Sequence, residues 1–341
     1  MQLTPGKLWG LRRMADERGI FKMTAVDQRP PIKAPIARAL GLPEAPWEEV
    51  ARFKGLLIET LQSPSTAMLL DPSYAVPHSL DRLSPAKGLI VTLEDSIFRE
   101  TPGGRLSSDI DDWSVAKIKR MGADAVKALV WYRPDADRNV IRQQRDYVRR
   151  VGEECARFDI PFLLELLVYP LRGEDGQTQD YVEQPGKKSD HVLASVEEFA
   201  KADYRVDVFK LESPVPAEEA DGSDAVQKLF DEMGRLAGRP WVMLSAGAGK
   251  EAFARVLEHA FRAGASGFLA GRAIWADAFA AYPDWGVVEA GLRGASLAYL
   301  SDIGAMADRA AAPWHLHPCW GEDGARFRPA NASFRHRYAG L

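Results

Sequence analysis

Residues 161–169 read PFLLELLVY, a nearly continuous apolar run that is interrupted by Glu165. Its length and its leucine, valine and aromatic content predict a strand that is buried on both faces, as in a parallel sheet. Residues 123–131 (ADAVKALVW) form a similar run around Lys127, and residues 206–212 (VDVFKLE) repeat it around Lys210. A charge inside a buried strand is costly unless it has a partner, so this pattern bears on the chemistry as well as on the fold.

Eight runs of this kind, including these three, recur along the chain. They are Phe21–Asp27, Thr66–Asp71, Gly88–Glu94, Ala123–Trp131, Pro161–Tyr169, Val206–Glu212, Trp241–Gly247 and Ser266–Arg272. Between them lie segments with helical periodicity, at Glu48–Gln62, Val115–Met121, Ile141–Phe158, Ser195–Ala202, Ala225–Ala237 and Glu251–Ala263. The alternation predicts a parallel sheet covered by helices, and eight strands over roughly 250 residues favour a closed (β/α)₈ TIM barrel.

An open, doubly wound sheet is the competing α/β architecture. It usually carries a glycine-rich dinucleotide loop after its first strand, where this chain has DQRPP at 27–31. Neither GxGxxG nor GxxxxGK[ST] occurs anywhere in the sequence. We therefore assign residues 1–310 to a single barrel domain, and residues 311–341 to a tail that packs on the barrel or at an oligomer interface.

The composition excludes several classes of partner. The 341 residues carry a formal net charge of −4, which gives no reason to expect nucleic acid or an anionic membrane. We find no secretory signal and no apolar stretch of membrane-spanning length. The two cysteines, Cys155 and Cys319, form no disulfide framework and suit a reducing compartment. We expect a cytoplasmic protein without a cofactor, and a homo-oligomer, for which a dimer is the simplest assumption.

Among the charged residues of the predicted strands, four are candidates for a catalytic cluster: Asp27, Lys127, Glu165 and Lys210. Side chains two residues apart share a face of a strand. The rows that contain these charges are Met23, Ala25 and Asp27; Ala123, Ala125 and Lys127; Leu163 and Glu165; and Val206, Val208 and Lys210. If the rows face the barrel interior, the charges converge at its C-terminal mouth, where barrels place catalytic groups.

Two lysines beside two carboxylates indicate Schiff-base chemistry. An ordinary lysine, with a pKa of ~10.4, is protonated and cannot attack a carbonyl. Burial and a neighbouring cation lower the pKa of a lysine, and a nearby carboxylate can shuttle the protons of imine formation. A protonated imine is an electron sink that allows a C–C bond to break, which is class I aldolase or decarboxylase chemistry.

An anion site is predicted after the last two strands. Residues 245–249 (SAGAG) offer small side chains and backbone N–H groups before a helix, and Gly271-Arg272 end the eighth run. Loops in these positions are a recurring phosphate site in barrels.

These segments also carry a family resemblance. The chain resembles the class I tagatose 1,6-bisphosphate aldolases, a group of Schiff-base barrel aldolases, from about Lys7 to about Arg309. The matching segments are AVDQR (25–29), LLDPSYAVP (69–77), DWSVAKIKRMGADAVKALVWY (112–132), IPFLLELLVY (160–169), VDVFKLESPV (206–215), LSAG (244–247) and AGRAIWA (270–276). The chain departs from the family pattern at Pro30-Pro31, which we expect to stiffen the loop after the first strand, in the insertion 172–190, and in the tail after Ala311.

The resemblance implies a role for each matching residue. Lys210 would form the imine and Glu165 would shuttle protons, while Lys127 and Asp27 would tune Lys210 and hold substrate hydroxyls. Gln28 would lie beside Asp27 at the substrate. The phosphate of the dihydroxyacetone-phosphate half would be bound by the backbone of Leu244, Ser245, Ala246 and Gly247, together with Gly271-Arg272. The substrate would be a ketose 1,6-bisphosphate such as tagatose 1,6-bisphosphate, cleaved without a metal to dihydroxyacetone phosphate and glyceraldehyde 3-phosphate.

Three alternatives stay open. A sister family cleaves 6-deoxy-6-sulfofructose 1-phosphate with a similar lysine, and the quoted motifs do not separate it. A non-catalytic regulator could bind sugar phosphates in such a barrel, although a binder has no need for a neutral lysine. A zinc-dependent aldolase would need clustered histidines, and only the string His315-Leu316-His317-Pro318-Cys319 resembles part of a metal site.

Overall fold

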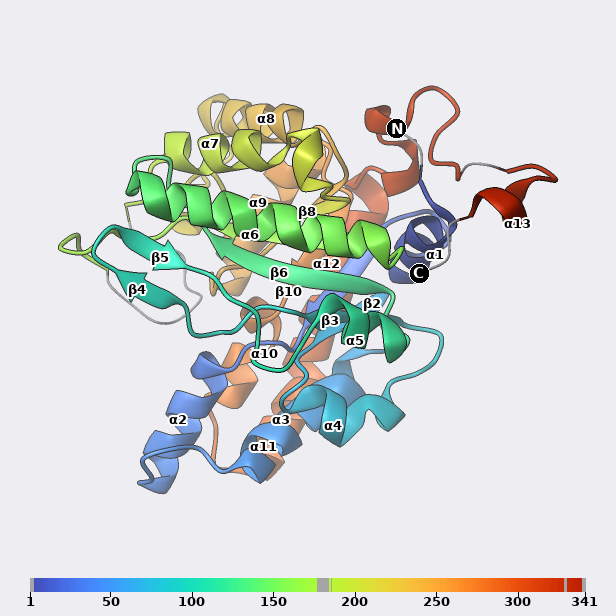
Figure 1. Ribbon diagram of the computed structural model, residues 1–341. Coiled ribbons are helices and arrows are strands. Elements are labelled where there is room, and N and C mark those ends of the chain that lie inside the picture. Colours follow the sequence, from blue (N-terminus) through green and yellow to red (C-terminus); the bar gives the residue numbers. More distant parts are fainter. Residues whose placement is uncertain (1–2, 177–183, 185, 328–329, 339–341) are drawn as a thin grey trace.

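Eight parallel strands form a closed barrel in the computed structural model, which describes all residues except 1–2, 177–183, 185, 328–329 and 339–341 (Figure 1). Around the barrel the order of the strands is β1-β10-β9-β8-β7-β6-β3-β2. Their bounds are β1 Phe21–Ala25, β2 Ala67–Leu70, β3 Gly88–Thr92, β6 Ala125–Trp131, β7 Phe162–Leu167, β8 Val208–Leu211, β9 Trp241–Met243 and β10 Gly267–Ala270. Each strand lies within one of the eight predicted runs, so the predicted (β/α)₈ barrel is confirmed.

Helices surround the barrel, with α6, α7 and α8 along one side of it in Figure 1. The helices are α1 Pro5–Met14, α2 Pro30–Leu40, α3 Trp47–Leu61, α4 Ala75–Ser79, α5 Val115–Arg120, α6 Arg138–Arg157, α7 Ser189–Phe199, α8 Asp224–Ala237, α9 Lys250–Arg262, α10 Arg272–Phe279, α11 Trp285–Gly291, α12 Leu297–Ala310 and α13 Phe334–Arg337. Short helical turns occur at η1 Leu80–Arg82, η2 Ala202–Tyr204, η3 Ala217–Glu219, η4 Leu292–Ser296, η5 Trp314–Leu316 and η6 Pro318–Trp320. The six predicted helices correspond to α3 and to α5 through α9.

The segment after β1 differs from the prediction. Pro30 and Pro31 do not stiffen a loop but form the first turn of α2. Proline is tolerated there because the first N–H groups of a helix have no intrahelical acceptor. The loop between β1 and α2 is consequently short, and it contains Asp27, Gln28 and Arg29.

A hairpin that the sequence did not predict follows β3. Its antiparallel strands, β4 (Arg99–Thr101) and β5 (Gly104–Leu106), are too short to give a clear alternation. The backbone N–H of Arg105 donates to the hydroxyl of Tyr169 at 3.0 Å. Its guanidinium lies over the rings of Phe98 and Trp131, 4.0 and 4.9 Å from their centroids. The hairpin thus packs against the end of β6 and the segment that follows β7, at the C-terminal mouth of the barrel.

The barrel interior is filled by small and medium apolar side chains from every strand. This layer consists of Met23, Ala25, Ala67, Leu69, Ile90, Ala125, Leu163, Val208, Val242 and Leu269. The predicted rows therefore face inward where they lie within the strands. Ala123 and Val206 are exceptions, because each precedes its strand and packs with the outer core instead.

The N-terminal face of the barrel is closed by α1 and by the turns η5 and η6. Leu11 and Met14 of α1 pack with Trp314 and Trp320 in the same cluster as the barrel interior. The ammonium of Lys7 forms a buried ion pair at 2.7 Å with Asp207, which precedes β8.

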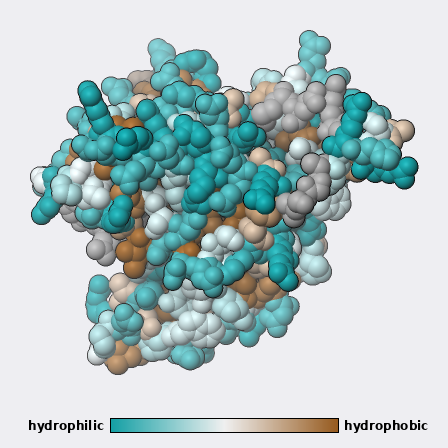
Figure 2. Space-filling model, viewed as in Figure 1, coloured by the Kyte–Doolittle hydropathy of each residue, from teal (hydrophilic) through white to brown (hydrophobic). Residues whose placement is uncertain are grey.

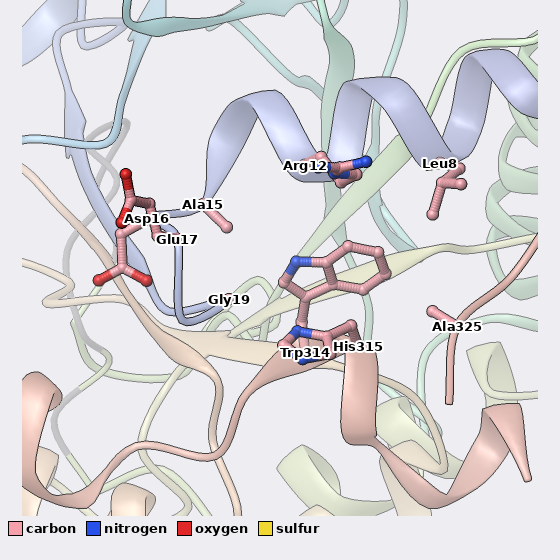
Figure 3. A pocket seen from close by; sticks show the side chains of 9 residues that line it. All are labelled: Leu8, Arg12, Ala15, Asp16, Glu17, Gly19, Trp314, His315 and Ala325. Carbon is pink, nitrogen blue, oxygen red and sulfur yellow. The ribbon is translucent and has the colours of Figure 1, made fainter. Parts of the chain in front are cut away.

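A pocket opens on the same N-terminal face, between α1 and η5. It is lined by residues that include Leu8, Arg12 and Trp314 (Figure 3). It lies at the end of the barrel opposite to the predicted site.

The outer surface is mainly hydrophilic on the face shown in Figure 2, with small separate apolar areas. Every helix within the described part of the chain is too short or too polar to cross a lipid bilayer.

Candidate active site

Three charged side chains from adjacent strands meet inside the barrel. In the strand register Glu165 of β7 is paired with Lys210 of β8. On its other side Glu165 is paired with Leu129 of β6, which lies two residues after Lys127. The Nζ atom of Lys210 donates to Glu165 Oε2 at 2.8 Å. The same oxygen lies 2.7 Å from Nζ of Lys127. One carboxylate oxygen therefore bridges two ammonium groups.

Asp27 completes the predicted set of charges. It lies two residues after the end of β1, and its Oδ2 accepts a hydrogen bond from Lys127 Nζ at 2.9 Å. All four side chains are at most 8% exposed. The structure thus brings together the four residues that the sequence placed in different strands.

The surroundings favour ionised Asp27 and Glu165. Burial raises the pKa of each carboxyl, but the charges of Lys127 and Lys210 outweigh burial, and the pKa of each lies below its ordinary value. Both groups are therefore carboxylates at neutral pH and can accept protons.

A small cavity lies at the C-terminal mouth of the barrel, and Lys210 and Glu165 line it. Its other lining residues are Ala25, Gln28, Leu167, Leu244, Ser245, Ala246, Leu269, Gly271 and Arg272. Lys127 and Asp27 do not appear among the lining residues, and Lys127 is only 2% exposed. The two lysines thus differ, because Lys210 reaches the cavity whereas Lys127 lies behind Glu165.

The turn after β9 forms one wall of this cavity. The N–H of Ala248 donates to the carbonyl of Ser245 at 2.7 Å. Ala246 and Gly247 between them have φ values of 46° and 88°. This left-handed geometry is unusual for alanine and readily adopted by glycine. A Cβ added to Gly247 would lie 3.3 Å from the guanidinium carbon of Arg272, so the turn and the first residue of α10 are in close contact. The predicted anion-binding residues therefore converge on the cavity that contains Lys210.

Gln28 and Gly271 pack closely against each other in the lining of the same cavity. A Cβ on Gly271 would come within 2.6 Å of the Gln28 amide nitrogen and 2.8 Å of the Ala25 carbonyl oxygen, so only glycine leaves room for this amide. Within the described residues, Gln28 Oε1 is buried and has no hydrogen-bond partner. A buried acceptor without a donor is costly, and a ligand hydroxyl in the cavity would satisfy it.

Glu94 belongs to the same cluster, and the sequence reasoning missed it. It follows β3 and is 1% exposed, and its Oε1 lies 2.5 Å from Lys127 Nζ. Ile90, Thr92 and Glu94 have the two-residue spacing of side chains that face the barrel interior. Glu94 could have been predicted from this spacing. Arg29 also contributes, because its guanidinium donates to the backbone carbonyl of Glu94 at 3.0 Å.

Two other buried ion pairs lie at the C-terminal ends of barrel strands. Lys54 of α3 is paired with Asp71 after β2, and both side chains are fully buried. Lys187 is paired with Glu212 after β8 at 3.1 Å. Neither pair lines the cavity. A charge at a strand end is therefore not sufficient to mark a site residue.

The predicted insertion 172–190 lies partly outside the described residues. Its first part is held by Arg133, whose guanidinium contacts Glu174 and Asp135. Its last part includes Lys187 and the beginning of α7.

The string from His315 to Cys319 forms the turns η5 and η6. The Nδ1 atom of His317 accepts the N–H of Cys319 at 3.2 Å, which is a helix-capping contact. Among the described residues there is no group of three or more His, Cys, Asp or Glu side chains arranged to hold a metal ion.

Comparisons with known proteins give a consistent result. A family model described as DeoC/LacD family aldolase matches residues 21–277. The chain is 34% identical over 328 residues to a tagatose 1,6-diphosphate aldolase of Listeria monocytogenes. The aligned residues cover 92% of this chain and 95% of that protein. It is 35% identical over 286 residues to tagatose 1,6-diphosphate aldolase 2 of Enterococcus faecalis, with 81% and 85% covered.

Solved structures agree on the fold. A Schiff-base-forming fructose-1,6-bisphosphate aldolase superposes with a TM-score of 0.55 at 16% identity, over 88% of this chain and 98% of that one. A fructose-bisphosphate aldolase from Plasmodium falciparum gives a TM-score of 0.66 at 12% identity, over 92% and 97%. At these identities the likeness shows the shared barrel alone.

Proposed function

The chain belongs to the DeoC/LacD family of aldolases, and on this premise we propose that it cleaves a ketose 1,6-bisphosphate through a Schiff base on Lys210. The products are dihydroxyacetone phosphate and glyceraldehyde 3-phosphate, and the preferred substrate is tagatose 1,6-bisphosphate. The observation that carries the proposal is the contact of Lys210 Nζ with the Glu165 carboxylate at 2.8 Å, at the wall of the cavity in the C-terminal mouth of the barrel.

Lys210 is the nucleophile because it reaches the cavity. Its amine must lose a proton before it attacks the substrate carbonyl, and Glu165 is the base within hydrogen-bond distance. Attack gives a carbinolamine, and Glu165 then returns a proton as the hydroxyl leaves as water. Lys127 is less suited to this role because three carboxylates surround its ammonium.

The imine that forms carries a positive charge next to Glu165 and Asp27. It withdraws the electron pair of the C3–C4 bond when that bond breaks. The C4 hydroxyl loses its proton in this step, and a carboxylate of the cluster accepts it. The resulting enamine takes up a proton at C3, and water releases dihydroxyacetone phosphate. Lys127 holds Asp27 and Glu165 in place throughout, since it contacts both.

The C1 phosphate binds between the β9 turn and Arg272. The backbone of Leu244–Gly247, the guanidinium of Arg272 and the N-terminus of α10 meet at this wall of the cavity. A guanidinium and helix N–H groups are favourable partners for a phosphate dianion. Gln28 Oε1, which also lines the cavity, accepts a hydrogen bond from a substrate hydroxyl.

The identity of the distal group decides between a bisphosphate and a 6-deoxy-6-sulfofructose 1-phosphate substrate. The names of the curated relatives favour the 6-phosphate. The test is the release of dihydroxyacetone phosphate from the two ketoses under matched conditions, with Lys210→Met as the blank. We expect a higher kcat/KM for tagatose 1,6-bisphosphate. Turnover of the sulfonate alone would assign the chain to the sulfosugar reaction, and release of no triose phosphate from either would refute the proposal.

A further inference from the structure

A lysine from the surrounding helices reaches the chain just past the end of β1, next to the catalytic cluster. Lys54 of α3 is fully buried, and its Nζ donates to the backbone carbonyl of Val26 at 2.6 Å. The same Nζ forms the ion pair with Asp71. Val26 directly precedes Asp27, whose carboxylate contacts Lys127. Lys54 thus lies one peptide unit away from a residue of the cluster, although it does not line the cavity.

The carbonyl that Lys54 contacts is coupled to the orientation of Asp27. The carbonyl of Val26 and the N–H of Asp27 belong to one planar peptide unit, so fixing the oxygen fixes the direction in which the chain enters Asp27. The N–H of Val26 donates to the Leu69 carbonyl at 2.8 Å, which continues the pairing of β1 with β2. After Asp27, the Arg29 guanidinium holds the chain by donating to the Glu94 carbonyl. Lys54 is therefore the side chain that holds the peptide unit on the N-terminal side of Asp27.

Asp71 fixes Lys54 in this position. One oxygen of its carboxylate accepts the N–H groups of Ser73 and Tyr74 at 2.9 and 2.8 Å, and the other pairs with Lys54. Both side chains of the pair are closed to solvent, so water cannot take over the contact with the Val26 carbonyl. A buried carbonyl that loses its donor is costly unless its peptide unit turns toward another donor. Such a turn would also move Asp27.

We propose that Lys54 is a positioning residue that orients Asp27 toward Lys127 through the carbonyl of Val26. The inference rests on the proposed function, in which Lys210 forms the imine. The Oδ2 atom of Asp27 lies 2.9 Å from Lys127 Nζ, so a displacement of about 1 Å would break this hydrogen bond. Lys127 would then lose one of the carboxylates that hold it beside the catalytic base.

The test compares the two partners of the buried ion pair. Lys54→Met removes the donor from the Val26 carbonyl, and kcat should fall about 10- to 100-fold because the cluster is misplaced. Asp71→Asn removes a charge of the same pair but leaves Lys54 in contact with Val26, so kcat should stay within about 3-fold of wild type. Equal losses of kcat in the two variants would overturn the inference, because the ion pair rather than the carbonyl contact would then be responsible.

A double-mutant cycle with Asp27→Ala separates positioning from a general loss of structure. If Lys54 acts through Asp27, removing the Asp27 carboxylate leaves Lys54 nothing to orient. The combined variant Lys54→Met/Asp27→Ala should then have a kcat within about 3-fold of that of Asp27→Ala alone. A merely structural role would multiply the two losses of kcat, and losses that multiply would overturn the inference.

Lys7→Met is the matched control. Lys7 forms a buried ion pair with Asp207 at 2.7 Å at the N-terminal face of the barrel, away from the cluster. The same substitution at this position also leaves a buried carboxylate without its cation, yet kcat should stay within about 3-fold of wild type. All variants are assayed at a temperature at which calorimetry shows them to be folded. A loss of kcat in Lys7→Met as large as that in Lys54→Met would overturn the inference.

Two further arms keep the outcome decisive. If Lys54→Met does not fold, Lys54→Met/Asp71→Asn replaces it with the same expected kcat, because removing both charges avoids an uncompensated buried carboxylate. Borohydride trapping with dihydroxyacetone phosphate is measured in wild type. Absence of an adduct on Lys210 would refute the proposed imine itself. An adduct in wild type together with a normal kcat in Lys54→Met would overturn only the role of Lys54.

Discussion

Replacing Lys127 with methionine should destabilise the protein in a way that depends on pH. The substitution keeps most of the side-chain volume but removes the ammonium that contacts Asp27, Glu94 and Glu165. Removing one partner of a buried ion pair costs about 3–5 kcal/mol. The unfolding entropy of a 341-residue chain is about 0.7 kcal/mol/K, so Tm should fall by about 4–7 °C near neutral pH.

The sign of the pH dependence follows from the carboxyl pKa values. In wild type, Asp27 and Glu165 have folded pKa values below their ordinary ones, so their stabilisation is complete above the ordinary pKa and is lost as the pH falls through the folded value. Without Lys127 the folded pKa values should rise above the ordinary ones. Stability is then greatest at acid pH and is lost as the pH rises. The Tm deficit should therefore be larger at about pH 7.5 than at about pH 5.

Differential scanning calorimetry at the two pH values measures this deficit. Lys54→Met is the matched control, because its partner Asp71 keeps hydrogen bonds from the backbone N–H groups of Ser73 and Tyr74 at 2.9 and 2.8 Å. Because these two backbone donors remain with Asp71 in the variant, the deficit of this control should be similar at both pH values. A Lys127→Met deficit that is equal at both pH values would refute the pairing of Lys127 with ionised Asp27 and Glu165.

Three further predictions concern catalysis. Glu165→Gln should retain the fold and lower kcat by ~10²–10⁴-fold, as steady-state kinetics will show, because the amide cannot exchange protons with Lys210; a wild-type kcat would require another shuttle. Arg272→Ala should weaken transition-state stabilisation for C1-phosphorylated ketoses by about 2–4 kcal/mol, as calculated from the loss of kcat/KM. Any cleavage of unphosphorylated ketoses should barely change, and equal losses for both would make Arg272 structural. Cleavage should persist after dialysis against EDTA, because the imine supplies the electron sink; a loss that zinc restores would contradict this.

The barrel and most of the cluster could be predicted because they depend on local sequence. Each buried parallel strand reads as an apolar run, and a charge inside such a run is visible without any tertiary information. Lys127, Glu165 and Lys210 were found in this way. Glu94 ends the run GLIVTLE, and the sequence analysis did not predict it as a site residue.

The partners of strand-end charges could not be predicted. Asp71 and Glu212 also end apolar runs, yet they pair with Lys54 of α3 and with Lys187, which shortly precedes α7. Whether a carboxylate faces the cavity or a structural lysine depends on contacts between distant segments.

Segments with little periodicity were also missed. The three-residue strands of the hairpin before α5 gave no clear pattern, and Pro30-Pro31 was interpreted as part of a loop rather than as a helix start.

Peptide mapping after borohydride reduction tests the central claim most directly. The protein is incubated with dihydroxyacetone phosphate and reduced, and its peptides are then analysed by mass spectrometry, with Lys210→Met treated in parallel. We predict that the reduced triose phosphate adduct appears on the peptide that contains Lys210 and is missing from the variant. An adduct on Lys127 alone, or no adduct on either lysine, would contradict the assignment of Lys210 as the imine-forming residue.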